Sequence, residues 1–356
     1  MIASLARAAT PVALALASFL SVSALVRRAV PWPDPLLLRP KMEAFEREAD
    51  DVDVLLIGSS RTFRGIAPDV LDERLAARGH PLRSWNLAVG GMRRHEAAGL
   101  LRRVLERAPP RLRVVLIEWG PWEATFDAPR NVWTDRSAAW HDAPGTRHAI
   151  AGALELDLPW PERLGIAGRH ASLFLHRLTA YGRGGDVLRA WAGRDRPSNP
   201  THRRVVDDMI RRRGYRSQRV VSAATHAPRF AAELDRWREE VAGIDAVHRL
   251  DVAEGPAAAA AREAQFAAVR AAGAEPVVFT GPGAEATPGA FALERAGRLP
   301  AFFPLNSPKL HPELYLAEHH FERLHLNDDG AAAASRILAD LLADHLERAT
   351  PPRERR

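Results

Sequence analysis

Along much of this chain, segments with the apolar pattern of strands alternate with segments with the apolar pattern of helices. Short segments with the length of strands lie at Val52 to Ile57, Arg83 to Val89, Val114 to Glu118 and Glu275 to Thr280. Their β-branched and apolar content is typical of strands buried in a parallel sheet. Helical spacing and proline boundaries predict helices at Pro68 to Ala77, Met92 to Arg107, Pro256 to Ala272 and Asp329 to Leu346. This alternation predicts an α/β fold: a doubly wound parallel sheet flanked by helices.

Three regions depart from that rhythm. Residues 122–255 are irregular, with tryptophans among short helical stretches, and we interpret them as an insertion over the C-terminal edge of the sheet. Residues 281–300 are rich in glycine and proline and predict a loop. Residues 351–356 predict a disordered tail. The α/β domain is therefore expected to span residues 51–350.

The N-terminus carries a long uncharged segment. Ala8 to Val26 has no charged residue, and about 19 helical residues span about 28 Å, close to the hydrocarbon thickness of a bilayer. Residues 1–30 are expected to be an uncleaved membrane anchor or, with Val22-Ser23-Ala24 as a cleavage site, a signal peptide. A buried core helix is the remaining alternative. Arginines on both sides leave the orientation open. Pro31, Pro33 and Pro35 predict that residues 31–50 form a linker.

Composition narrows the possible functions. The net charge is +6, and Lys41 and Lys309 are the only lysines, so arginine carries almost all the positive charge. Heavy alanine and arginine usage is typical of a GC-rich genome, and attraction to anionic headgroups or acidic glycans is the functional alternative. The arginines are scattered among acidic residues without a binding motif, which argues against a nucleic-acid partner. The absence of cysteine excludes disulfides and thiol nucleophiles.

Two strand ends carry candidate chemistry, because ligands of doubly wound sheets bind beyond the C-terminal ends of strands. Gly58-Ser59-Ser60-Arg61 follows the first strand, where a serine exposes its hydroxyl beside backbone N–H groups. The alternative is a serine that caps a helix. The second strand ends at Asn86 and is followed by Gly90-Gly91, whose backbone can approach a ligand closely. A plain turn would look the same.

A third candidate lies near the C-terminus, at Glu322-Arg323-Leu324-His325. A carboxylate three residues before a histidine can accept the imidazole Nδ1–H, which leaves Nε2 free to accept a proton from serine. An Asp or Asn that caps the last helix is a compatible alternative. His319 and His320 lie close by, but His-Glu-x-x-His is absent, and so are phosphate-binding and dinucleotide-binding glycine motifs. We therefore predict no metal and no cofactor.

Together these motifs resemble the SGNH, or GDSL-like, hydrolase superfamily. The resemblance implies a flavodoxin-like strand order, Ser60 as nucleophile, His325 as general base and Glu322 in place of the usual aspartate of Asp-x-x-His. It implies an oxyanion hole formed by the N–H groups of Ser60 and Gly91, with Arg61 and Asn86 as substrate-binding residues. The family's Gly-x-Asn-Asp block is missing, since the third strand ends Glu118-Trp119-Gly120-Pro121.

The Gly58-Ser59-Ser60 start resembles membrane-anchored branches of that superfamily, the D-alanyl transfer proteins and the alginate O-acetylation proteins. Pro304-Leu305-Asn306-Ser307 and His325-Leu326-Asn327 resemble their C-terminal part. This implies an acyltransferase or esterase acting on a cell-surface polysaccharide at the inner or plasma membrane, with the catalytic domain extracytoplasmic. A membrane-bound O-acyltransferase is the implied partner. The alternatives are a lipid esterase and a non-catalytic glycan-binding scaffold that uses Trp133, Trp140 and Trp160.

Overall fold

A five-stranded parallel sheet forms the centre of the protein in a computed structural model, which describes residues 2–30, 37–120, 135–192, 199–218 and 223–349. Its strands are β1 (Val54–Ile57), β2 (Ser84–Asn86), β3 (Val114–Glu118), β4 (Glu275–Thr280) and β5 (Phe302–Pro304). The order is β2-β1-β3-β4-β5, and every neighbouring pair is parallel. This is a doubly wound order. The predicted α/β class with a parallel sheet is confirmed.

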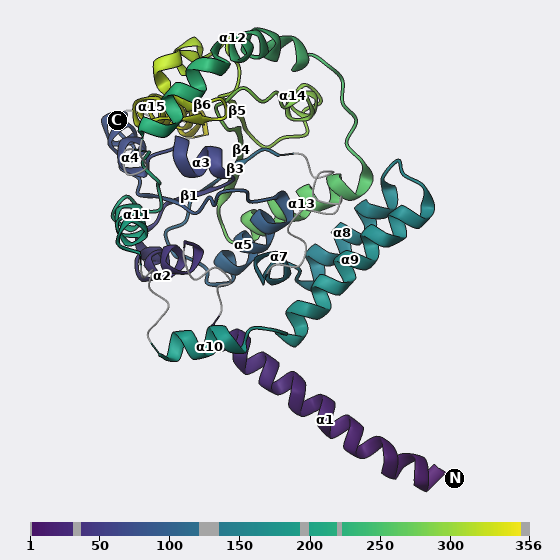
Figure 1. The fold of residues 1–356 in the computed structure, drawn as a ribbon. Coiled ribbons are helices and arrows are strands. Elements are labelled where there is room, and N and C mark those ends of the chain that lie inside the picture. The colour runs from purple at the N-terminus through teal and green to yellow at the C-terminus, as the bar shows by residue number, and fades with distance from the viewer. Residues whose placement is uncertain (1, 31–36, 121–134, 193–198, 219–222, 350–356) are drawn as a thin grey trace, which may run out of the picture.

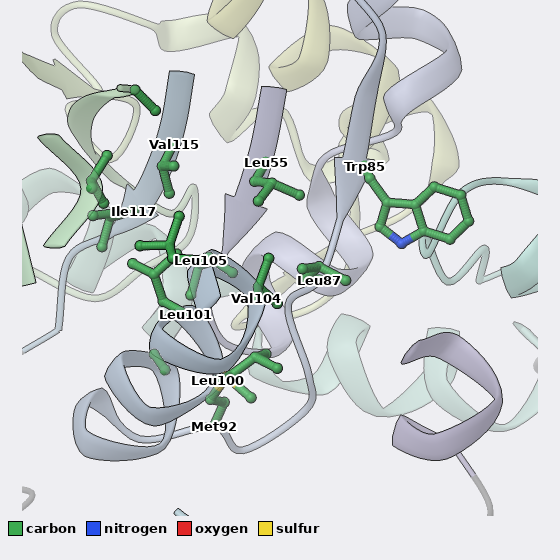
Figure 2. Packing of buried hydrophobic residues seen from close by; sticks show 14 of the residues in the cluster. Leu55, Trp85, Leu87, Met92, Leu100, Leu101, Val104, Leu105, Val115 and Ile117 are labelled. Carbon is green, nitrogen blue, oxygen red and sulfur yellow. The ribbon is translucent and has the colours of Figure 1, made fainter. Parts of the chain in front are cut away.

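Alternating side chains of the strands build a core on each face of the sheet, because successive residues of a strand point to opposite faces. Leu55 and Val115 pack on one face against Leu101 and Val104 of α5 (Arg94–Glu106), as Figure 2 shows. The other face packs against two helices, α4 (Pro68–Ala77) and α15 (Asp328–Ala349). Helices therefore cover both faces of the sheet (Figure 1).

Several predicted strands and helices begin and end at the residues where the structure has them. β3, β4 and α4 have the predicted bounds, and α13 (Pro256–Ala271) ends one residue early. β2 is shorter than predicted: beyond Asn86 the Ala88 N–H bonds the Asn86 side chain, while the N–H groups of Leu87 and Val89 still bond the carbonyls of Leu56 and Gly58. β5 was not predicted.

Two segments predicted to lack structure are helical. Residues 31–50 were expected to be a linker, but α2 (Leu38–Glu48) buries Leu38, Met42 and Phe45 in the main core, followed by a 3₁₀ turn, η1 (Ala49–Asp51). Spacings of four and three residues put these side chains on one helical face. Within the predicted loop 281–300 lies α14 (Pro288–Arg295), with proline at its first position. The proline spacer at 31–35 and the predicted tail lie outside the described residues.

The middle region is largely helical and packs mainly beside the sheet's helices. Its described helices are α7 (Asp135–Ala139), α8 (Ala143–Glu155), α9 (Trp160–Thr179), α10 (Gly184–Trp191), α11 (Pro200–Arg211) and α12 (Ala223–Val247). Small residues of α8 and α9 pack against α5 and α13. α12 contacts β6 (His320–Glu322), and Tyr215, Ser217 and Gln218 bond Asp328 nearby, at the edge where the insertion was expected.

The N-terminal segment forms a single long helix, α1 (Ile2–Ala29), that projects from the body of the protein (Figure 1). Its stretch Thr10–Ala29 has 20 residues with a mean hydropathy of 1.6 and is only 6% buried. That length and composition suffice to cross a membrane, and signal sequences share them.

Candidate active site

The turn that follows β1 places Ser60 at the C-terminal edge of the sheet. Ser59 is the N-cap of a short helix, α3 (Ser60–Gly65), and its side chain accepts the Arg61 N–H at 3.3 Å. Gly58 is required because a Cβ there would lie 2.3 Å from an oxygen of Glu118. Ser60 therefore sits at the first position of a helix, where backbone N–H groups have no partner within the helix.

His325 and Glu322 complete a chain of hydrogen-bonding groups with Ser60. The Nε2 atom of His325 lies 2.7 Å from Ser60 Oγ, and its Nδ1 atom hydrogen-bonds Glu322 Oε1. Glu322 and His325 are directly paired in a short antiparallel hairpin of β6 and β7 (His325–Leu326). The hairpin backbone therefore holds the two side chains next to each other. The structure thus brings together all three residues predicted as catalytic.

The Glu322 carboxylate is held in its charged form. Partial burial acts to raise its pKa, but the hydrogen bond and charge of His325, with help from the Leu324 N–H, bring the pKa below its usual value. An ionised Glu322 accepts the Nδ1–H of His325 and leaves the Nε2 lone pair directed at Ser60 Oγ. This arrangement can remove a proton from the serine hydroxyl.

Gly91 lies on the loop that faces Ser60. Its φ is +68°, a conformation that favours glycine, and the neighbouring turn is closed by a hydrogen bond from the Met92 N–H to the Val89 carbonyl. A Cβ built on Gly90 would come within 4.0 Å of the Ser60 Cβ. The loop is therefore close enough to Ser60 for its backbone to border a group bound at the hydroxyl.

Glu118, at the end of β3, organises the turn that carries Ser60. Its carboxylate accepts hydrogen bonds from Ser59 N (2.6 Å), Ser59 Oγ (2.7 Å), Thr62 Oγ1 (2.6 Å) and Arg61 Nε (2.9 Å). Burial acts to raise its pKa, but Arg61 and the hydrogen bonds hold it below its usual value. At the end of this strand the sequence indicated only that the Asn of a Gly-x-Asn-Asp block is missing. A charged residue ending an otherwise apolar strand is the signal that could have identified this role.

The two residues predicted to bind substrate occupy different positions. Arg61 is mostly buried, pairs with Glu118 and Glu285, and borders a cavity beside the turn that carries Ser60. Asn86 is fully buried and donates to the carbonyls of Thr62 and Ile66, both at 2.8 Å. Asn86 therefore positions α3: its buried amide bonds backbone groups and is closed to solvent, which corrects the sequence-based prediction of a substrate contact.

The cavity beside the turn that carries Ser60 has a volume of about 330 Å³. Ser59, Arg61, Gly91, Arg93 and Trp119 are among its lining residues. A second, more apolar cavity of about 160 Å³ shares Arg61, Trp119 and Glu285 with it. The combined space is in the range of ligand pockets, which begins at about 300 Å³.

Lys41 is a further buried group behind the site. Its Nζ donates to the Ala88 carbonyl and lies 4.1 Å from the centre of the Phe63 ring. Burial lowers the Lys41 pKa well below its usual value. The lysine thus supports the segment between Asn86 and Gly91. Sequence reasoning missed it, because nothing in its local sequence marks it as buried.

The histidines next to Glu322 are engaged elsewhere. His319 Nδ1 lies 2.6 Å from the Glu313 carbonyl, and His320 Nε2 lies 2.9 Å from that of Leu314. Asn327 caps α15 by accepting the N–H groups of Asp329 and Gly330, as the alternative interpretation of this segment expected. Within the described ranges, no three His, Asp or Glu side chains are grouped so that they could hold a metal ion.

Comparison with known proteins adds no assignment. No protein-family model matches the sequence, and no curated protein matches it significantly.

Proposed function

We propose that this chain is a membrane-anchored serine acyltransferase or esterase of the SGNH type, which acts on acyl groups of a cell-surface polysaccharide, most simply acetyl groups. The observation that carries the proposal is the 2.7 Å contact between Ser60 Oγ and His325 Nε2, with Glu322 on the opposite ring nitrogen. The motif resemblance supplies the substrate class. No cofactor or metal takes part in the proposed reaction.

In the proposed mechanism, Ser60 Oγ attacks the carbonyl carbon of an acyl ester while His325 Nε2 takes the hydroxyl proton. Glu322 stabilises the imidazolium that forms. Backbone N–H groups of Ser60 and Gly91 bind the oxyanion. Collapse of the tetrahedral intermediate breaks the bond to the leaving alcohol, which receives the proton from Nε2 and leaves an acyl-Ser60 ester. Water or a sugar hydroxyl then attacks this ester, His325 again accepts and returns the proton, and Ser60 is regenerated.

The proposed location follows from α1. A 20-residue apolar helix that is mostly unburied supports a single-pass anchor in the inner or plasma membrane. The resemblance favours an extracytoplasmic domain and a membrane-bound O-acyltransferase that delivers the acyl group.

The experiment is hydrolysis of a chromogenic acetyl ester, and transfer of acetyl to a polysaccharide, by the full chain and by Ser60→Ala. We expect Ser60→Ala to lose nearly all activity with unchanged thermal stability. The control is Ser172→Ala, which removes a half-buried serine of α9 whose hydroxyl bonds the Gly168 carbonyl. Equal activity in folded Ser60→Ala would remove Ser60 as nucleophile.

The non-catalytic scaffold gains little support from its tryptophans. Trp140 is buried in the core and Trp133 lies outside the described residues, which leaves Trp160, 58% exposed on α9. A lipid esterase would instead be recognised by activity on long acyl chains without any glycan.

A further inference from the structure

The end of α1 is fixed to the folded domain by polar contacts with α9 and α10. Ser23 Oγ donates to the Thr179 carbonyl at 2.7 Å, and Arg183 Nη2 donates to the Val30 carbonyl at 2.7 Å. Arg27 donates to the carbonyls of Arg177 and Leu178. Figure 1 shows α1 leaving the body beside α10. The helix is therefore seated on the domain and not joined to it by a loose tether.

This seating fixes which part of the domain lies at the membrane surface. Thr10–Ala29 has 20 residues, and at about 1.5 Å per residue it spans about 30 Å, the thickness of the hydrocarbon core. Its last turn consequently lies at the level of the lipid headgroups. The residues that contact Arg27 and Val30, at the end of α9 and the start of α10, lie near the same level.

The surface around this contact carries large apolar side chains that are exposed. Trp191 is 87% exposed, Tyr181 74% and Leu188 66%. Leu188 and Trp191 lie three residues apart on α10 and therefore on one face. Exposed aromatic and aliphatic side chains next to a membrane helix are typical of elements that lie in the membrane interface.

Beside the last turn of α1, the domain contains a cavity of about 300 Å³. Five arginines line it: Arg27, Arg102, Arg103, Arg177 and Arg183. The lining includes two carboxylates, Glu106 and Asp142, so three positive charges are in excess.

Asp142 is already engaged by Arg102 through two hydrogen bonds of 2.6 and 2.7 Å. Burial, together with the charge of Arg177, lowers the pKa of Arg103 to about 10, and burial with Arg27 and Arg102 nearby lowers that of Arg177. A bound anion would relieve this accumulation of positive charge.

We infer that this cavity binds the phosphate of an anionic phospholipid headgroup, while the exposed face of α10 rests in the membrane interface. The inference depends on the proposed anchoring of α1 but not on catalysis. Guanidinium groups suit phosphate because they donate in pairs. Arg103 and Arg177 provide the charge, and the arginines at the end of α1 place it at headgroup depth. The bound lipid would fix the orientation of the domain relative to the membrane.

The test is a lipid titration followed by native mass spectrometry of the detergent-solubilised full chain, with phosphatidylglycerol and phosphatidylcholine as probes. We expect preferential retention of one phosphatidylglycerol. Removing a charge near an anionic surface weakens binding about fivefold, so Arg103→Gln with Arg177→Gln should weaken it about 25-fold. The matched control is Arg236→Gln with Arg238→Gln, two exposed arginines of α12.

Two single substitutions of Arg177 test the same cavity with less risk of misfolding than the double variant. Arg177→Gln should weaken phosphatidylglycerol binding about fivefold, whereas Arg177→Lys, which keeps the charge, should stay near the native value. Equal retention of the two lipids by the native chain would overturn the inference, and so would equal losses in the cavity and control variants. The titration can be repeated with Ser60→Ala protein, so a failure of the proposed catalysis and a failure of lipid binding are seen separately.

Discussion

The Nε2 atom of His325 lies 2.7 Å from the Oγ atom of Ser60, although 265 positions of sequence separate the two residues. Ser60 begins the helix after the first strand, and His325 lies in a hairpin just before the last helix. Parallel strands bring their C-terminal ends to one edge of the sheet, and the hairpin lies over that edge. The proposed chemistry depends on this meeting of the two ends of the domain.

Glu322 should be needed for turnover more than for folding. Glu322→Gln should lower kcat by about 10³- to 10⁴-fold, because an amide no longer holds the histidine tautomer that leaves Nε2 free. Glu322→Asp, with a shorter arm, should keep intermediate activity. Ester hydrolysis measured beside thermal melting checks this. A loss of activity matched by an equal loss of folded protein would contradict a role in orienting His325.

Gly91 should be required by the reaction and not only by the turn. Gly91→Ala forces a left-handed conformation on alanine at a cost of about 1–2 kcal/mol, while a Cβ there meets no atom within 4 Å. Gly297→Ala, at a φ of +65° and equally open, is the matched control. Both variants should lose similar stability in urea unfolding, and Gly91→Ala alone should lose activity. Equal activities would argue against an oxyanion contact at Gly91.

Glu118 should make stability depend on pH. Its pKa is lower in the folded chain than in the unfolded chain, so its contribution is present above the usual value of 4.5 and is lost as the pH falls through the folded value. Glu118→Gln should melt below the native protein at pH 7, and the difference should shrink toward pH 3. Glu73→Gln, on the exposed side of α4, should melt like the native protein throughout. A constant difference between native and Glu118→Gln would contradict the assignment.

Asn86 should contribute to the stability of the fold by holding α3 in place. Asn86→Ala removes the amide donor from the Ile66 carbonyl and one of the two donors from the Thr62 carbonyl, which keeps the Ile66 N–H, so the expected cost is about 1–3 kcal/mol for the buried group that loses its partner. Asn199→Ala removes an exposed helix cap that bonds the Thr201 N–H and should cost about 1 kcal/mol. Urea unfolding compares the two variants. A cost for Asn86→Ala no larger than that of the control would contradict the positioning role.

The sequence predicted the parts of the fold that depend on local pattern. β3, β4 and α4 are continuous apolar or proline-started segments whose ends coincide with changes in composition, and their bounds were predicted correctly. β5 and α2 were missed. Phe302–Pro304 is too short to show a period, and α2 follows three prolines that suggested a spacer. Tertiary burial of Leu38, Met42 and Phe45 decides that α2 belongs to the core.

The candidate site was predictable where several motifs together resemble a known superfamily, as for Ser60, Glu322 and His325. The roles of Glu118 and Lys41 come from burial and from partners distant in sequence, which no local pattern reveals. Asn86 shows the converse, since its motif suggested a ligand contact, whereas the structure uses both its N–H donors to hold backbone carbonyls.

The central claim is that the Ser60 hydroxyl is made reactive by His325. Its most direct test is treatment of the full chain with a fluorophosphonate, followed by peptide mass spectrometry of the native protein and of His325→Ala. The account predicts one stoichiometric adduct on Ser60, formed at least about 100-fold more slowly in His325→Ala, in line with general-base catalysis. A folded native protein without an adduct, or one whose Ser60 reacts equally fast without His325, would contradict it.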